Sequence, residues 1–168
     1  MELKHVLASL VATFALAGHA ATIDWGLHTP VEMASRTVET GSFKDTIDFS
    51  LTAPASITSV TVSNNLPSWL TLSSGEVSLF ARATSPAGTD TLLGHYTFDG
   101  TTGSTDHTFA ATTAGDFYYL VQGKGTGNIG GLYVLTSSAS AVPEPQTWAL
   151  TLASLLVVGT VYLRRKKH

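Results

Sequence analysis

The sequence predicts an all-β ectodomain, either an antiparallel β-sandwich or a jelly-roll-like fold, between an N-terminal signal peptide and a single C-terminal transmembrane helix. Between residues 21 and 142, short segments with apolar residues at alternate positions are separated by clusters of Gly, Pro, Asn, Asp and Ser. Each end of the 168-residue chain carries an apolar segment beside basic residues. We therefore expect three parts: a signal peptide (1–20), a β-sandwich (21–142) and a C-terminal signal (143–168).

The first 20 residues have the pattern of a secretory signal peptide. Lys4 and His5 precede an apolar run over residues 6–17, and small residues, Gly18 and Ala20, follow it. Small residues at positions −3 and −1 suit signal peptidase. We expect cleavage between Ala20 and Ala21.

The C-terminal apolar segment, residues 148–163, is uncharged and short. At about 1.5 Å per residue it would form a helix of roughly 24 Å, against a hydrocarbon core of about 30 Å. A basic cluster follows it directly and should remain cytoplasmic, which fixes the topology: Arg164, Arg165, Lys166 and Lys167. This pattern predicts a membrane-spanning helix.

Pro143, Glu144 and Pro145 precede that helix. Proline does not continue a helix and favours extended backbone in the residue before it, so this triplet should be an extended strip accessible to a processing enzyme.

A Pro-Glu-Pro triplet, a short apolar helix and terminal arginines resemble a PEP-CTERM sorting signal, a segment also labelled an ice-binding-protein C-terminal region. The resemblance covers Pro143, Glu144, Pro145, Arg164 and Arg165. It implies processing by the membrane protease-transpeptidase exosortase in a Gram-negative bacterium that makes exopolysaccharide. It does not imply binding to ice.

The central segments predict strands. In residues 45–52 the alternation places Ile47, Phe49 and Leu51 on one face, and Asp45 and Asp48 mostly outside. Residues 56–62 break the alternation, which predicts a bulge or a change of register. Further strands are expected around Val77 and Leu79, and at 92–98, 108–111, 117–122 and 132–136.

Turn-forming residues separate these segments, at 64–65, 73–75, 86–88, 99–100 and 114–116. The one segment that could form an amphipathic helix is 31–38. Spacing of this kind favours an antiparallel sandwich or jelly roll.

Several segments together resemble the FxDxF-type PEP-CTERM proteins over nearly the whole chain. These are Asp24-Trp25-Gly26 with His28, residues 41–47 (GSFKDTI), residues 115–121 (GDFYYLV), Gly123 and Gly130-Gly131. The chain departs from that pattern at Ile47, where the second Phe would stand, and a β-branched Ile also suits an inward strand position. The resemblance implies export and surface association, without an established biochemical activity, and the motif is interpreted as core packing.

Composition excludes some classes of function. Residues 21–142 contain four basic and ten acidic side chains. Because this net negative charge repels phosphate backbones, nucleic acid is not expected as a partner. The chain has no cysteine, which excludes disulfides, thiolate metal sites and a cysteine nucleophile.

Residues 125–130 (GTGNIG) match the G-x-G-x-x-G pattern of dinucleotide sites. That pattern requires a following helix. The next residues, GLYVLTSS, favour a strand, so a glycine-rich hairpin connection is expected instead.

Three histidines of this region, His28, His95 and His107, lack the spacing of a zinc site or catalytic triad. His95 and His107 are expected on the surface. Asp99 and Asp106 flank the most plausible calcium loop, although a solvated loop is favoured because the EF-hand order is missing. No cofactor is expected.

Four aromatic residues could form a platform for sugars: Trp25, Trp69, Tyr118 and Tyr119. Adjacent tyrosines on a strand point to opposite faces, so at least one of Tyr118 and Tyr119 should lie in the core.

Together these features predict a non-enzymatic exported protein, first anchored in the membrane and then displayed on the surface or released into extracellular polymer. Its partners would be signal peptidase and an exosortase-type enzyme. A carbohydrate-binding module acting on exopolysaccharide is the alternative, and a hydrolase would require a convergent acid pair or triad.

Overall fold

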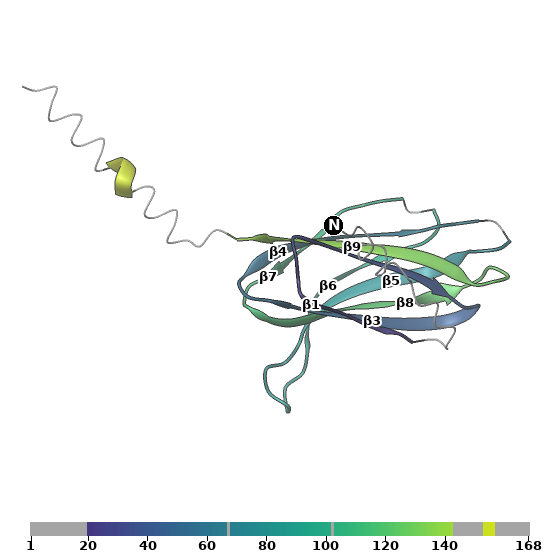
Figure 1. The fold of residues 1–168 in the computed structure, drawn as a ribbon, viewed down its shortest axis with the longest axis horizontal. Coiled ribbons are helices and arrows are strands. Elements are labelled where there is room, and N and C mark those ends of the chain that lie inside the picture. Colours follow the sequence, from purple (N-terminus) through teal and green to yellow (C-terminus); the bar gives the residue numbers. More distant parts are fainter. Residues whose placement is uncertain (1–19, 67, 102, 143–152, 157–168) are drawn as a thin grey trace, which may run out of the picture.

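The computed structural model describes residues 20–66, 68–101, 103–142 and 153–156, and within them the chain forms nine strands (Figure 1). In chain order they are β1 (Thr22–Leu27), β2 (Val31–Val38), β3 (Gly41–Leu51), β4 (Ala55–Ser63), β5 (Leu72–Ala81), β6 (Thr91–Phe98), β7 (His107–Ala111), β8 (Gly115–Gly125) and β9 (Gly131–Ala141). The all-β prediction for the central region is confirmed.

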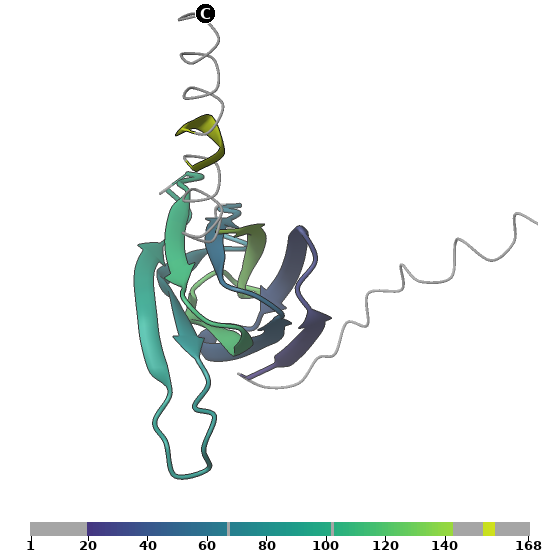
Figure 2. The same ribbon diagram turned by 90° about the vertical axis from the view of Figure 1, so that its left-hand side faces the viewer.

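The strands form two sheets that face each other (Figure 2). One, here called sheet A, has the order β1-β3-β8-β5-β6, and the other, sheet B, has the order β2-β9-β4-β7. The antiparallel pairs are nested, β2 with β9, β3 with β8, β4 with β7 and β5 with β6. This nesting is the pairing of a jelly roll. Strand β1 departs from a purely antiparallel sandwich, because it pairs with β3 in parallel.

Strand β3 contributes one face to the core, and the prediction for Ile47, Phe49 and Leu51 is confirmed, since all three are buried. The prediction that Asp45 lies outside is wrong: its side chain shares their face, and the residue is 1% exposed. Period two requires this result, because Asp45 is two positions from Ile47. Phe43, Asp45 and Ile47, the motif positions, therefore all point inward.

Strand β4 contains no bulge, contrary to the prediction. It pairs without a register shift with both β7 and β9. Ile57, Ser59 and Thr61 are buried, whereas Val60 and Val62 lie on the outer face. The alternation is regular, but two of the inward positions carry hydroxyl groups.

Residues 31–38 form strand β2 and not a helix. Ala34 and Val38 are buried, whereas Val31 and Met33 are exposed. Strand β2 is an edge of sheet B and gains its hydrogen bonds from β9. Tertiary pairing decides the conformation here, because the spacing of Ala34 and Val38 fits either period.

The predicted turn at residues 73–75 lies inside β5. The register with β8 shifts between Ser73 and Glu76, and Ser74 has a positive φ of 55°. The turn-forming residues thus produce a bulge within the strand.

Strand β9 ends at one end of the sandwich, and the loop after β5 projects from its side (Figures 1 and 2). Residues 153–156 are helical. No helix among the described residues has the length and apolarity required to cross a membrane. Most of the predicted signal peptide, the sorting motif at Pro143–Pro145 and the basic cluster at 164–167 lie outside the described residues, so those predictions stand as predictions.

Candidate functional site

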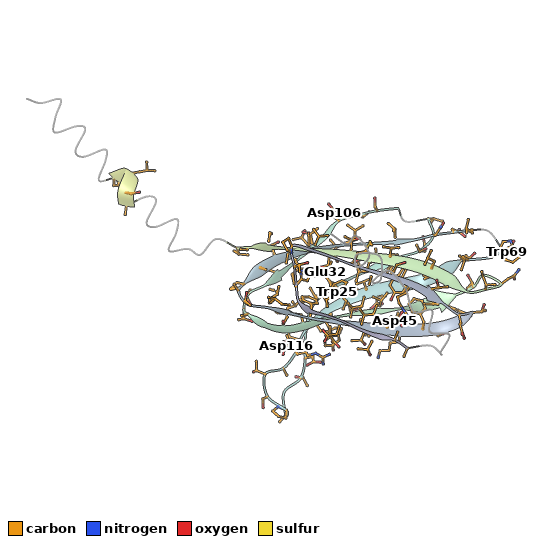
Figure 3. All side chains as sticks on the ribbon, in the orientation of Figure 1. Trp25, Glu32, Asp45, Trp69, Asp106 and Asp116 are labelled. Carbon is orange, nitrogen blue, oxygen red and sulfur yellow. The ribbon has the colours of Figure 1, made fainter. Side chains whose placement is uncertain are left out.

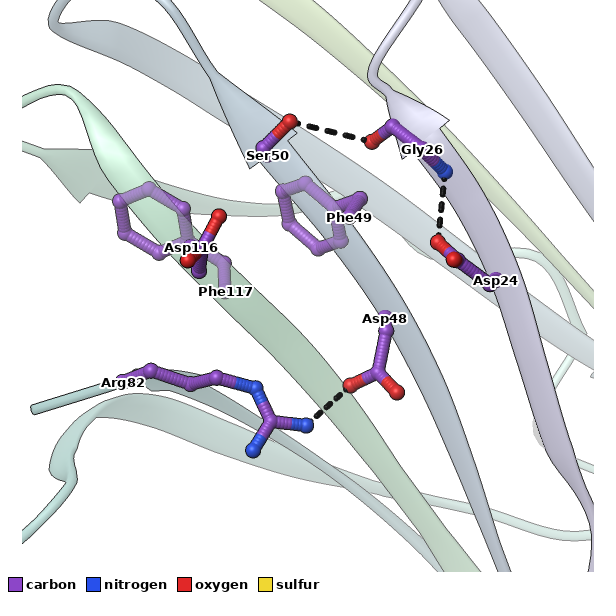
Figure 4. A pocket seen from close by; sticks show the side chains of 8 residues that line it. All are labelled: Asp24, Gly26, Asp48, Phe49, Ser50, Arg82, Asp116 and Phe117. Atoms are coloured by element: carbon purple, nitrogen blue, oxygen red, sulfur yellow. Dashed lines mark hydrogen bonds and ion pairs between the residues drawn. The ribbon is translucent and has the colours of Figure 1, made fainter. Parts of the chain in front are cut away.

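A groove of about 310 Å³ lies on the outer side of sheet A, near one end of β1, β3 and β8 (Figure 4). Its lining combines three carboxylates and one guanidinium with backbone and apolar positions, from Asp24, Gly26, Asp48, Phe49, Ser50, Arg82, Asp116 and Phe117. The side chains of Phe49 and Phe117 are buried in the core beneath it. These residues come from three paired strands and from the position after β5. We call this the sheet A groove.

A bulge in β1 forms one wall of the groove. The register between β1 and β3 shifts between Asp24 and Leu27. At this point Gly26 has a φ of 64°, a conformation that glycine adopts without steric cost. The Gly26 N–H donates to Asp24 Oδ1 at 2.7 Å, and the Ser50 hydroxyl donates to the Gly26 carbonyl at 3.4 Å. The Asp24-Trp25-Gly26 sequence therefore shapes the wall.

Arg82 and Asp48 form an ion pair across the groove (Figure 4). The hydrogen bond to Asp48 raises the pKa of the Arg82 guanidinium, so the group remains cationic. The Arg82 side chain is 44% exposed, which leaves much of it open to a ligand. Three carboxylates accompany this one guanidinium, so the groove has acceptors for hydroxyl donors as well as a cationic donor.

An aromatic pair extends the groove over the face of sheet A. Phe80 and Tyr118 stack with their ring centroids 5.0 Å apart, and the Arg82 guanidinium lies 4.6 Å from the centroid of Tyr118. The Tyr118 hydroxyl donates to Asp90 Oδ2 at 3.0 Å. Aromatic faces beside charged hydrogen-bonding groups suit ligands that combine apolar ring faces with polar edges.

Asp90 joins the projecting loop to this face. Its Oδ1 accepts the Ala83 N–H at 2.9 Å, and this bond, followed by the one from Tyr118, lowers the pKa of the Asp90 carboxyl. Burial and the Asp90 bond raise the pKa of Tyr118. At neutral pH the pair is therefore a neutral phenol bound to a carboxylate.

The four aromatic candidates do not share one surface. Tyr118 faces outward and Tyr119 is fully buried, which confirms that the adjacent tyrosines lie on opposite faces. Trp25 packs against Phe49 and Tyr119 at the core. Trp69 is 62% exposed, at the end of the sandwich far from residue 142 (Figure 3).

The three histidines have different surroundings. His95 is exposed, as predicted, whereas His107 is half-buried and stacks on Tyr96 with ring centroids 3.9 Å apart. The His28 Nε2 atom lies 2.9 Å from the Ser137 hydroxyl, which is buried. Among the described residues, no three His, Asp or Glu side chains are placed to hold a metal ion.

The calcium candidates belong to the connection between β6 and β7. Asp99 Oδ1 accepts both the backbone N–H and the hydroxyl of Thr101, each at 2.7 Å, in a local turn. Asp106 is exposed at the other end of this connection. In the described part of the chain the two carboxylates do not join a metal-binding group.

Residues 125–130 are followed by strand β9, as predicted, but they connect the two sheets and not two paired strands. Gly127 and Gly130 exchange N–H···O bonds of 3.0 Å in both directions. A Cβ atom at Gly130 would lie 1.8 Å from the Val38 carbonyl oxygen. Close packing of backbone, and not phosphate binding, therefore explains these glycines.

The sequence does not indicate that the residues of the groove lie together. Arg82, Asp48, Asp116 and Phe80 are brought together by strands far apart in the chain. Asp24, Gly26 and Asp116 lie in segments that resemble the FxDxF-type proteins, but nothing in the sequence indicates that these segments meet.

At the amino-terminal boundary, Ala20 is exposed and Ala21 is partly buried. Both predicted cleavage residues thus lie at the edge of the folded domain.

No family model matches the sequence, and no curated protein matches it at a significant level. Among solved structures, the chain is similar to the pre-peptidase C-terminal domain of a collagenase from Bacillus anthracis. The TM-score is 0.43 at 16% identity, over 70% of this chain and 94% of the other.

Proposed function

We propose that the protein is an exported, non-enzymatic component of the cell surface or extracellular matrix, sorted through its C-terminal PEP-CTERM signal. An exosortase-type enzyme would recognise Pro143–Pro145. The apolar segment would hold the substrate in the membrane, and the basic cluster at residues 164–167 would fix its topology. The protein would thus be anchored in the inner membrane of a Gram-negative bacterium before release or surface display.

The observation that carries this proposal is the position of the sorting motif relative to the sandwich. The buried apolar residues of the described core all fall between Ala34 and Leu135, and β9 ends at Ala141. The Pro-Glu-Pro triplet begins two residues later. Cleavage there would release the sandwich without removing any strand from it.

The outer face of sheet B supports a structural or adhesive role. Val31, Met33 and Val62 are exposed on it, and Leu132 and Val134 are partly exposed between them. Apolar side chains gathered on a solvent-facing sheet are typical of a surface that contacts another molecule.

Intact-mass measurement of the exported protein tests the proposal. We expect a species that begins at Ala21 and ends near Pro145. Replacing Pro143, Glu144 and Pro145 by alanine should retain the C-terminal segment, and replacing Ser138 and Ser140 by alanine, close by in β9, is the control. Export of wild-type protein that still carries residues 148–168 would instead make it a plain anchored protein.

Carbohydrate binding is the second candidate function, and the sheet A groove favours it. The stacked Tyr118 and Phe80 offer an aromatic surface, while Arg82 and the groove carboxylates offer partners for sugar hydroxyls. Co-sedimentation with exopolysaccharide from the producing strain should be lost in Tyr118→Ala and kept in Trp69→Ala. Equal binding by both variants would exclude the groove as the binding site.

A further inference from the structure

The amino-terminal edge of the domain lies against a buried carboxylate. The backbone nitrogen of Ala21 donates to Asp45 Oδ1 at 2.8 Å. Asp45 is 1% exposed and lies between the two sheets (Figure 3). The predicted signal-peptidase cut would convert this same nitrogen into the new amino terminus.

The strand ladder fixes the position of Ala21. Its carbonyl accepts the Thr46 N–H at 2.7 Å, and the next residue, Thr22, is in register with Thr46 in the parallel β1–β3 pair. Ala20, immediately before it, is exposed. The nitrogen of Ala21 is therefore held at the carboxylate by the sheet, while the bond that would be cut lies at the surface.

The two oxygens of the Asp45 carboxylate have different partners. The Tyr133 hydroxyl donates to the other oxygen, Oδ2, at 2.7 Å. Arg36 Nε lies 3.6 Å from Oδ2, and within the described structure this atom forms no hydrogen bond. The carboxylate is thus bonded by one neutral hydroxyl and one backbone N–H, with a single cation nearby.

We propose that removal of the signal peptide creates an ion pair between the Ala21 α-ammonium and Asp45, and that this ion pair stabilises the folded mature domain. Water adds to the Ala20 carbonyl carbon, the C–N bond breaks, Ala20 keeps a carboxylate and the Ala21 nitrogen takes up protons to become –NH₃⁺. An α-amino group has an ordinary pKa of about 7.7–8.0, so it is largely cationic at neutral pH. A neutral donor to a buried carboxylate is thereby replaced by a cationic donor at the same place.

The physical consequence is a domain that is more stable after export than before it. A buried carboxylate gains most from a cation that is hydrogen-bonded and held in place by its surroundings. In the precursor, Asp45 receives only the hydrogen bond from the neutral Ala21 N–H. The inference rests on the proposed export, since it needs cleavage at Ala20–Ala21.

Chains with defined amino termini test the Ala21–Asp45 ion pair separately from export. One chain runs from Ala21 to His168, and a second begins one residue earlier at Ala20; both are released from a fusion partner in detergent. Chemical unfolding is followed by near-UV circular dichroism. We expect the folding equilibrium constant of the Ala20 chain to be about tenfold lower. Asp45→Asn should abolish this difference, and Asp48→Asn, on the same strand but facing outward, should preserve it.

Equal stability of the two wild-type chains would overturn the proposal, as would a difference that persists in Asp45→Asn. Labelling of the α-amine with an acylating reagent gives a second measurement if Asp45→Asn does not fold. The amine of the folded Ala21 chain should react more slowly than that of the Ala20 chain, and equal rates would contradict the ion pair with Asp45. Intact mass of the exported chain reports on cleavage alone, so an amino terminus other than Ala21 would refute cleavage at Ala20–Ala21 and not the ion-pair geometry.

Discussion

At the scale of single residues, the interior of this sandwich is polar at specific points. The Tyr96 hydroxyl contacts the hydroxyls of Ser59 at 3.1 Å and Thr61 at 2.8 Å. The Tyr119 hydroxyl lies 2.9 Å from that of Ser137. Each buried tyrosine thus places its ring in the core and its hydroxyl on a partner from the opposite sheet, which satisfies the hydrogen-bonding requirement of buried polar groups.

Tyr133→Phe should destabilise the protein more than Tyr119→Phe. The Tyr133 hydroxyl donates to a buried carboxylate, and hydrogen bonds to charged groups contribute about 1.5–3 kcal/mol. The Tyr119 hydroxyl bonds a neutral serine, for which about 0.5–1.5 kcal/mol is expected. Urea unfolding of both variants measures the difference. Equal losses would show that the Asp45 carboxylate does not depend on Tyr133.

The burial of single residues could be predicted where the side chain is apolar. The prediction is wrong where polar residues face inward. The alternation around Ile47 and Phe49 identified the inward face of β3 correctly. The prediction for Asp45 is wrong because a carboxylate is rarely buried without a partner, and here it has one. That partner, Tyr133, lies 88 positions along the chain, and the local sequence contains no sign of it.

At the scale of elements, β2 and β4 show why alternation alone was insufficient. In β4 the inward positions are Ile57, Ser59 and Thr61. In the second half of this strand the apolar residues lie on the outer face, so the hydrophobic pattern predicts the wrong face as buried. In β2 the side chains of Glu32 and Arg36 share the side of the buried Ala34 and Val38. Inward-pointing charges are typical of edge strands, where they oppose pairing with another sheet.

Gly26 and Gly130, which both have positive φ, should respond very differently to alanine. Gly26→Ala meets no atom within 4 Å, and only its φ of 64° is unfavourable, which costs about 1–2 kcal/mol. Gly130→Ala combines a φ of 102° with a Cβ only 1.8 Å from the Val38 carbonyl oxygen, so a loss of about 4 kcal/mol or more is expected.

Thermal and urea unfolding of the two variants checks this order. A Gly130→Ala protein as stable as Gly26→Ala would mean that the connection between β8 and β9 can move away from β2. Gly26→Asn is the matched control, because asparagine tolerates the left-handed conformation better than alanine does.

At the scale of the whole molecule, the fold class was predictable, and the groove was not. Regular short strands and turn residues indicate a two-sheet sandwich whatever the register. The groove instead depends on register and order: β1 must pair in parallel with β3, and β5 must lie beside β8 so that Arg82 reaches Asp48. Such contacts across several strands leave no periodic trace in the sequence.

The buried tyrosines make the whole molecule sensitive to high pH. Burial is the main cause that raises the pKa of Tyr96, Tyr119 and Tyr133 above its ordinary value. In the unfolded chain these groups ionise near pH 10, whereas in the folded chain they keep their protons to higher pH. Above about pH 10 the folded state therefore holds more protons than the unfolded state, and the free energy of unfolding must fall as pH rises.

Above pH 10 the slope that each such tyrosine contributes rises toward about 1.4 kcal/mol per pH unit, until the folded protein itself ionises. Urea unfolding between pH 8 and pH 11 should show constant tyrosine-linked stability below the ordinary pKa and a steep decline above it. Tyr119→Phe removes one of these groups and should make the decline shallower by that amount, whereas Trp69→Phe, at an exposed site without a titratable group, should leave it unchanged. A slope that does not differ between Tyr119→Phe and wild type would contradict the prediction, because it would mean that the buried phenol ionises as readily in the folded sandwich as in water.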